Sequence, residues 1–179
     1  YSFRFKLIGT GEMEQPLKLQ ASEAGLLDKN VCFLGTMSPE NVRRHMENEG
    51  IYLFTSDRRE GWGAVLNEAM NSGCAVIASD AAGATPFLIK DGVNGSVYHS
   101  GSVQELYEKL RRLLDDTNLQ SRLGSEAYRT ITELWNAETA AKRLLQLSQT
   151  LLSGADASRL FADGPCSPAK PLREDWYRP

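Results

Sequence analysis

The sequence has few of the residues that indicate a metal centre or a disulfide framework. It contains three cysteines and two histidines in 179 residues. Cys32, Cys74 and Cys166 include no CxxC pair, and an odd, unpaired set is typical of a reducing compartment. We therefore expect a cytoplasmic protein. His45 and His99 lie far apart in the sequence and no acidic cluster has ligand spacing, so neither a metal nor another cofactor is expected.

Long apolar runs and an excess of positive charge are also missing. The longest apolar runs, residues 51–54 and 74–78, are strand-sized, whereas a bilayer span needs about 20 residues. The formal net charge of −3 argues against nucleic-acid binding as the main purpose. No signal peptide opens the sequence, and it begins as a strand without an initiator methionine. We interpret it as a piece of a longer protein.

What the sequence does contain is typical of one α/β domain. Hydrophobic residues make up 41% and charged residues 24%, which is an ordinary globular composition. Strand-like runs alternate with segments of helical spacing, and the expected strands cover residues 3–8, 31–34, 51–55, 75–79 and 96–98. The alternation predicts a parallel sheet with right-handed crossovers.

Helix boundaries follow from capping residues. Ser38 is expected to cap a helix that ends at Gly50, and residues 13–24 form the first helix, ended by Gly25. The patterns Ser102-x-x-Glu105 and Thr117-x-x-Gln120 predict two capping boxes, and Asn136 caps the last helix. That helix carries leucines expected to make core or domain-packing contacts: Leu144, Leu145, Leu147, Leu151 and Leu152. Residues 154–179 contain four prolines and no periodicity, so we expect an irregular tail.

The stretch from Thr55 to Gly73 is where we expect chemistry. It begins at the end of an apolar strand, passes through a polar loop and continues with helical spacing. Ligands of open α/β sheets bind beyond the carboxyl ends of the strands. Gly61 and Gly63 leave backbone N–H groups uncovered at the start of the helix, which is a suitable site for an anion such as phosphate.

Two carboxylates frame this loop. Glu60 precedes the helix and Glu68 lies within it, about 10 Å further along the axis. They are too far apart to share a proton, but they suit two ends of one elongated ligand. An ordinary role is equally consistent with the spacing: both can be solvated residues, and Glu60 can simply favour the positive end of the helix dipole.

The motifs around this loop resemble those of the retaining glycosyltransferases of family 4, also called group 1. The resemblance covers residues 3 to 150 and is carried by Glu60-Gly61-Trp62-Gly63, Asn67-Glu68-Ala69-Met70, the run from Ser72 to Asp80, Gly9-Thr10-Gly11, Val31 to Gly35 and Lys90 to Gly95. It implies half of an enzyme built from two Rossmann-like domains. Residues 1–153 would be the C-terminal, donor-binding domain, without its first strand. This domain would be a three-layer open parallel sheet with helices on both faces, followed by the tail 154–179.

The resemblance also implies residue roles. Glu60 would be the catalytic carboxylate beside the transferred sugar, and Glu68 would accept hydrogen bonds from the ribose hydroxyls. The amides of Gly61, Trp62 and Gly63 would approach the sugar or diphosphate. Thr36 and Met37 would lie near the nucleotide base. The implied partner is a nucleoside diphosphate sugar, used without a metal to move a hexose onto a glycan, a lipid-linked sugar or a small molecule.

Parts of such an enzyme are missing from this sequence. In the family, an Arg and a Lys that stabilise the departing diphosphate precede residue 1, and the acceptor site lies on the N-terminal domain. Any peripheral membrane contact would also be made through that domain. The sequence departs from the family at Phe87, where an acidic residue is usual. The loop from Asp80 to Pro86 consists of small residues, which either allow backbone to approach a ligand or form a plain turn.

Other functions remain open at this stage. Gly9-Thr10-Gly11 is half of a dinucleotide fingerprint, but Glu14 stands where the third glycine would be, which disfavours NAD. A sugar-nucleotide 2-epimerase shares the two-domain fold. A non-catalytic, partner-binding relative would keep the pocket without the chemistry.

Overall fold

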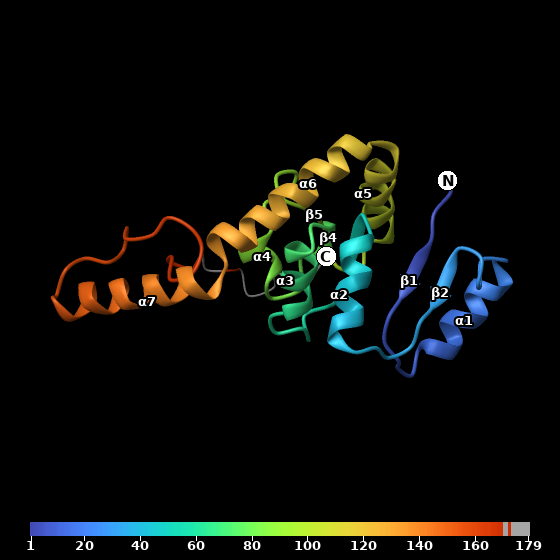
Figure 1. The fold of residues 1–179 in the computed structure, drawn as a ribbon, viewed down its shortest axis with the longest axis horizontal. Helices are drawn as coiled ribbons and strands as arrows, with labels where there is room; N and C mark the ends of the chain where they lie inside the picture. The colour runs from blue at the N-terminus through green and yellow to red at the C-terminus, as the bar shows by residue number, and fades with distance from the viewer. Residues whose placement is uncertain (170–171, 173–179) are drawn as a thin grey trace. The chain divides into compact units, whose positions relative to one another are not determined.

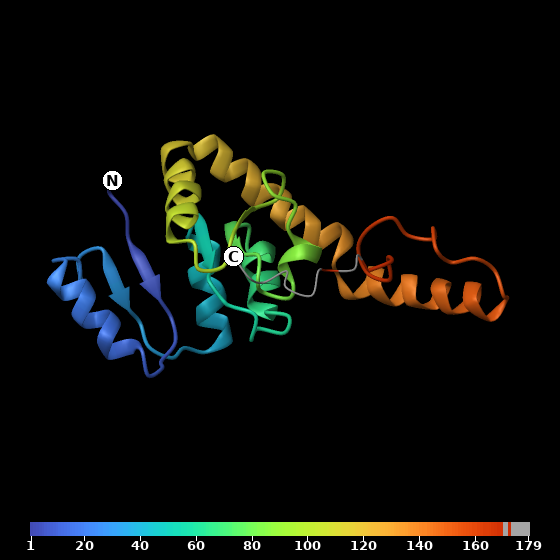
Figure 2. The ribbon, with the colours of Figure 1, turned by 180° about the vertical axis from the view of Figure 1, so that it is seen from behind.

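The computed structural model describes residues 1–169 and Leu172. The chain divides into two compact units, Tyr1–His45 and Met46–Pro179, and the boundary falls within helix α2 (Pro39–Asn48). Figure 1 shows the elements of both units, and Figure 2 shows them from behind. Each unit contains a parallel sheet with helices beside it.

The first unit contains strand β1 (Phe5–Leu7), helix α1 (Glu14–Glu23) and strand β2 (Val31–Phe33). The strands are parallel, with Leu7 opposite Phe33. As predicted, the first helix ends before Gly25, whose φ of +67° is the left-handed conformation that glycine adopts readily. The predicted cap of α2 is also confirmed, because the Ser38 hydroxyl accepts a hydrogen bond from the amide of Asn41 at 3.4 Å.

The second unit has a three-stranded parallel sheet in the order β3 (Ile51–Phe54), β4 (Ala75–Ser79), β5 (Ser96–Tyr98). All five residues of β4 are buried, as expected for a strand covered on both faces. The connections contain helices α3 (Ala64–Asn71) and α4 (Thr85–Leu88). The parallel α/β fold predicted from the alternation is therefore confirmed.

Four helical segments follow the sheet: α5 (Val103–Asp115), α6 (Thr117–Arg129), the single π-helical turn η1 (Thr130–Leu134) and α7 (Ala137–Leu152). Helices α5 and α6 pack against β4, and α6 also packs against α3. They complete a core of Ala75, Ile77, Tyr98, Leu113 and Leu123. No helix of the described residues is long and apolar enough to cross a bilayer.

The helix caps differ in part from the predicted ones. Ser102 caps α5 by accepting from the Glu105 amide, but the Glu105 carboxylate bonds to the backbone N–H and ring of His99 instead of closing the box. These contacts lower the pKa of Glu105 and raise that of His99. The predicted Thr117 cap is wrong, because Asp116 caps α6 by accepting from Leu119 at 2.9 Å. A carboxylate one residue earlier is a stronger acceptor than the hydroxyl.

The last helix begins where it was predicted but does not join the core. Asn136 accepts a hydrogen bond from the Thr139 amide at 2.8 Å and so caps α7. The leucines expected to make packing contacts are mostly exposed, with Leu152 at 88%. They are therefore not core residues of this unit. Residues 154–169 contain no helix or strand.

We predict that Gly124→Ala destabilises the protein, although alanine in an exposed helix is about 1 kcal/mol more favourable than glycine. Gly124 is buried in α6, and a Cβ there would lie 2.2 Å from the carbonyl oxygen of Gly73. Separating α6 from the sheet should cost about 1–3 kcal/mol. Urea unfolding followed by circular dichroism measures this. Ser125→Ala, on the exposed side of α6, is the control, and a Gly124→Ala protein as stable as the control would contradict the packing.

Candidate functional site

The candidate site lies on two loops that follow neighbouring parallel strands. Residues 55–63 connect β3 to α3, and residues 80–84 connect β4 to α4. Since β3 and β4 pair in parallel, both loops leave the same edge of the sheet. This is the edge at which open α/β sheets bind ligands.

The two loops are joined through their backbones. The amide of Gly83 donates to the carbonyl of Glu60 at 3.2 Å, and the amide of Ala84 donates to the carbonyl of Trp62 at 3.0 Å. A Cβ at Gly83 would lie 1.7 Å from the carbonyl oxygen of Gly61. The loop of small residues therefore approaches the Glu60–Trp62 segment itself, and only glycine at position 83 permits this contact.

This pairing determines where the neighbouring amides point. In a trans peptide the C=O and N–H groups point in opposite directions. Because the carbonyls of Glu60 and Trp62 face the loop of Gly83, the N–H groups of Gly61 and Gly63 point away from it. Among the described residues, none accepts a hydrogen bond from these two amides. Both amides can therefore donate to an acceptor that reaches them, such as a phosphate oxygen, and Gly61 is the exposed one of the two, whereas Gly63 is buried.

Gly63 also makes the turn into α3 possible. Its φ of +85° and ψ of 62° are left-handed, and a Cβ there would lie 2.4 Å from the ring of Phe54. Both the backbone conformation and the space exclude a side chain. The sequence-based interpretation of this glycine as the start of the helix is confirmed.

The side chain of Trp62 is held by three elements. Its indole N–H donates to Asn67 of α3 at 2.9 Å. Its ring stacks on Phe87 of α4 with centroids 5.9 Å apart and planes at 27°, and it lies 5.9 Å from the ring of Trp135 at the end of η1. The sequence marked Phe87 only as a departure from the family, and it gave no signal for Trp135.

The carboxylates occupy two different environments. Glu60 is half-buried in the loop, whereas Glu68 is exposed on α3. On β3, burial, followed by smaller contributions from Cys74 and Glu68, raises the pKa of Tyr52 to about 12. Their roles toward a ligand stay predictions.

The residues predicted to contact the base belong to the first unit. Thr36 and Met37 follow β2, with Thr36 exposed and Met37 half-buried. Their function also stays a prediction.

Cys74 is not a nucleophile of this site. It is fully buried, and its thiol donates to the carbonyl of Met46 at 3.2 Å. Burial, with a smaller contribution from the charge of Glu49, raises its pKa to about 11. The thiol is therefore protonated at neutral pH, and Cys74 is a small buried side chain of the core.

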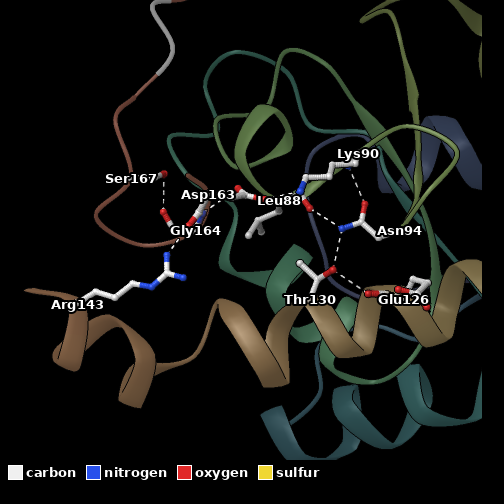
Figure 3. Close-up of polar contacts among 9 residues, drawn as sticks. All are labelled: Leu88, Lys90, Asn94, Glu126, Thr130, Arg143, Asp163, Gly164 and Ser167. Atoms are coloured by element: carbon white, nitrogen blue, oxygen red, sulfur yellow. Dashed lines mark hydrogen bonds and ion pairs between the residues drawn. The ribbon is translucent and has the colours of Figure 1, made fainter. Parts of the chain in front are cut away.

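A polar network supports the elements that carry Phe87 and Trp135 (Figure 3). Buried Asn94 donates to the Leu88 carbonyl and to the Thr130 hydroxyl, both at 2.9 Å, and it accepts from the Lys90 amide at 2.7 Å. Thr130 in turn donates to the carbonyl of Glu126 at 2.7 Å. One asparagine thus connects the end of α4 to the start of η1.

The segment after α7 adds contacts on the same side (Figure 3). Asp163 pairs with Lys90 through its carboxylate and accepts from Arg143 through its carbonyl. Gly164 is buried, and a Cβ there would lie 2.6 Å from Leu134 of η1. Residues 163–164 therefore contact both the end of α4 and η1.

We predict that Asn94→Ala lowers the free energy of unfolding by about 2–4 kcal/mol, because it leaves buried partners without hydrogen bonds. Thermal and urea unfolding measure the loss. Asn118→Ala, at an exposed position of α6, should change stability by no more than about 0.5 kcal/mol. Equal changes in the free energy of unfolding for Asn94→Ala and Asn118→Ala would show that the Asn94 network does not stabilise the protein.

We also predict that Gly83→Ala separates the two loops and costs about 1–3 kcal/mol. Gly61→Ala is the matched control, because no atom lies within 4 Å of a Cβ at that position. Differential scanning calorimetry of both variants tests this. A Gly83→Ala protein with the transition temperature of Gly61→Ala would refute the close approach.

Comparisons with known proteins identify the family of this chain. The family model for glycosyl transferases group 1 matches residues 1–130. An uncharacterised glycosyltransferase of Methanocaldococcus jannaschii is 27% identical over 147 residues, which cover 82% of this chain and 37% of the relative. A GDP-mannose-dependent phosphatidylinositol monomannoside mannosyltransferase of Mycobacterium tuberculosis is 26% identical over 86% of this chain and 40% of the relative. The chain thus spans about two fifths of the length of these relatives.

Solved structures show the same fold. The HepE protein of Anabaena, crystallised with UDP, has a TM-score of 0.71 at 28% identity, over 84% of this chain and 41% of that one. The C-terminal domain of a group 1 glycosyltransferase from Francisella tularensis has a TM-score of 0.61 at 31% identity, over 68% of this chain and 62% of that one. From its sequence and its fold, the chain belongs to the group 1 glycosyltransferases and corresponds to their C-terminal domain.

Proposed function

We propose that this chain binds the nucleoside diphosphate sugar for a retaining hexosyltransferase. The observation that carries the proposal is the pair of amides, Gly61 and Gly63, that point away from the neighbouring loop beside Glu60. Crystals of the Anabaena relative contain UDP or UDP-glucose, which supports a donor of this chemical class. The chemistry of the site fits a sugar joined to a diphosphate: amides donate to phosphate oxygens, and carboxylates accept from hydroxyls.

Each site residue has a distinct role in this proposal. The amides of Gly61, Trp62 and Gly63 bind diphosphate or sugar oxygens. Glu60 holds hydroxyls of the transferred hexose and stabilises positive charge at its anomeric carbon. Glu68 accepts hydrogen bonds from the ribose hydroxyls. Thr36 and Met37 lie near the nucleotide base.

In the proposed reaction, the bond between the anomeric carbon and the diphosphate oxygen breaks, and the electron pair leaves with the diphosphate. The acceptor hydroxyl oxygen bonds to the same face of that carbon, and its proton passes to the departing diphosphate oxygen. Negative charge grows on the diphosphate, so fixed N–H dipoles at its oxygens lower the barrier. We propose that no metal takes part, and that a cationic pair from another segment of the protein completes the site.

The whole protein supplies the rest of the activity in this proposal. An N-terminal domain binds the acceptor and makes any contact with a membrane, and the enzyme works in the cytoplasm. The 179-residue chain by itself should therefore bind the donor without transferring the sugar at a useful rate. A turnover assay in which this chain alone matches the full-length protein would contradict that division.

Donor binding is tested by thermal shift with UDP, GDP, ADP and their sugars. A ligand that binds only the folded state at 100 times its Kd adds about 2.7 kcal/mol of stability. One nucleotide series should raise the transition temperature in a concentration-dependent manner. The absence of a shift with every ligand would refute the proposed function.

The carboxylates are tested in the full-length protein. Glu68→Gln should weaken donor binding about 10- to 100-fold, because a hydrogen bond to a charged group is worth about 1.5–3 kcal/mol. Glu60→Gln should lower kcat by about 10²–10³. The exposed Glu47 of α2 provides the control, Glu47→Gln. Normal turnover in both site variants would refute the roles proposed for the two carboxylates.

A further inference from the structure

The aromatic rings around Trp62 are the feature that the proposed function leaves unused. Trp62 and Phe87 are 39% and 36% exposed, and Trp135 is half-buried. The three rings come from the β3–α3 loop, from α4 and from the end of η1. They bring together three segments that are far apart in the sequence.

The rings lie at the same junction as the backbone contacts between the loops. The carbonyl of Trp62 accepts from the Ala84 amide at 3.0 Å, and Phe87, which stacks on the Trp62 ring, follows Ala84 by three residues. Both the peptide and the side chain of Trp62 are therefore held by residues 84–87. The N–H groups of Trp62 and Gly63 belong to the two peptides that flank Trp62, so a rotation of that residue would turn them.

The exposed residues Gly61 and Trp62 are joined to the mostly buried loop 80–84 by two backbone hydrogen bonds, which would not by themselves hold the exposed segment in one direction. Each such bond contributes about 1 kcal/mol net in water. Stacked aromatic pairs contribute about 0.5–1.5 kcal/mol beyond their buried area, and the Trp62 N–H bond to Asn67 fixes the indole plane. The ring contacts thus supply an orienting constraint comparable to that of the backbone contacts.

We propose that Phe87 and Trp135 are positioning residues for donor binding, which act through Trp62 to aim the amides of Trp62 and Gly63 at the diphosphate. This inference rests on the proposed function. Phe87 stands where the family usually has an acidic residue, so in this chain an aromatic contact between loops occupies that position. In this proposal the rings of Phe87 and Trp135 contact Trp62 of the β3–α3 loop, and the loop, not these two rings, contacts the ligand.

The test separates the diphosphate from the rest of the donor. Affinities for UDP, GDP and ADP, and for uridine, guanosine and adenosine, are measured by calorimetry in the full-length protein. Phe87→Ala and Trp135→Ala should lower the affinity for the bound diphosphate at least fivefold, while the affinity for its nucleoside stays within twofold. Phe87→Tyr keeps the ring and should restore diphosphate binding, whereas Phe87→Leu keeps apolar volume and should not.

The controls distinguish positioning from stability. Tyr107→Ala removes an exposed aromatic ring from α5 and should leave both affinities unchanged. Transition temperatures without ligand identify variants that fail to fold, for which Phe87→Leu and Trp135→Phe are the milder replacements. Equal losses for diphosphate and nucleoside, or none in either, would overturn the inference. If the wild-type protein binds no nucleoside diphosphate, the proposed function is refuted, and this inference is refuted with it.

Discussion

The candidate site depends on one backbone contact, in which the loop at Gly83 meets the loop at Gly61 with no side chain between them. Two amides of one loop bond to two carbonyls of the other. This contact turns the amides of Gly61 and Gly63 away from the Gly83 loop. Without it, the segment would be an exposed polar connection with several available conformations. Gly83 therefore constrains the orientation of the Glu60–Gly63 segment, although the proposed function gives Gly83 itself no contact with a ligand.

The same principle operates beneath the site. Strand β4 is buried along its whole length, and α6 approaches the preceding turn closely enough that Gly124 faces the Gly73 carbonyl. Close approach of a helix to a sheet edge requires small residues, because a methyl group already fills the available space. Glycines thus set the spacing both in the core and between the loops that carry the site.

Much of this architecture follows from local sequence. Strand β4 is recognisable from its continuous apolar run, and Gly63 and Gly73 delimit α3 through turn chemistry alone. The cap of α6 was misassigned because Asp116 and Thr117 are adjacent acceptors, and only three-dimensional geometry selects between them. The ring of Trp135 beside Trp62 could not be predicted, because the contact joins residues more than 70 positions apart in the sequence. From the sequence, the loop from Asp80 to Pro86 was expected either to let backbone approach a ligand or to form a plain turn. Its contact with the Glu60 loop was not predicted.

The π-helical turn has a consequence for the helix register. The Trp135 amide bonds to the Thr130 carbonyl, five residues earlier, so this turn holds one residue more than an α-helical turn would. Each residue advances an α-helix by about 100°. Loss of a single residue from this turn would thus swing the indole of Trp135 to another side of the helix. The direction in which the Trp135 side chain points is therefore set by the number of residues in this turn as well as by their types.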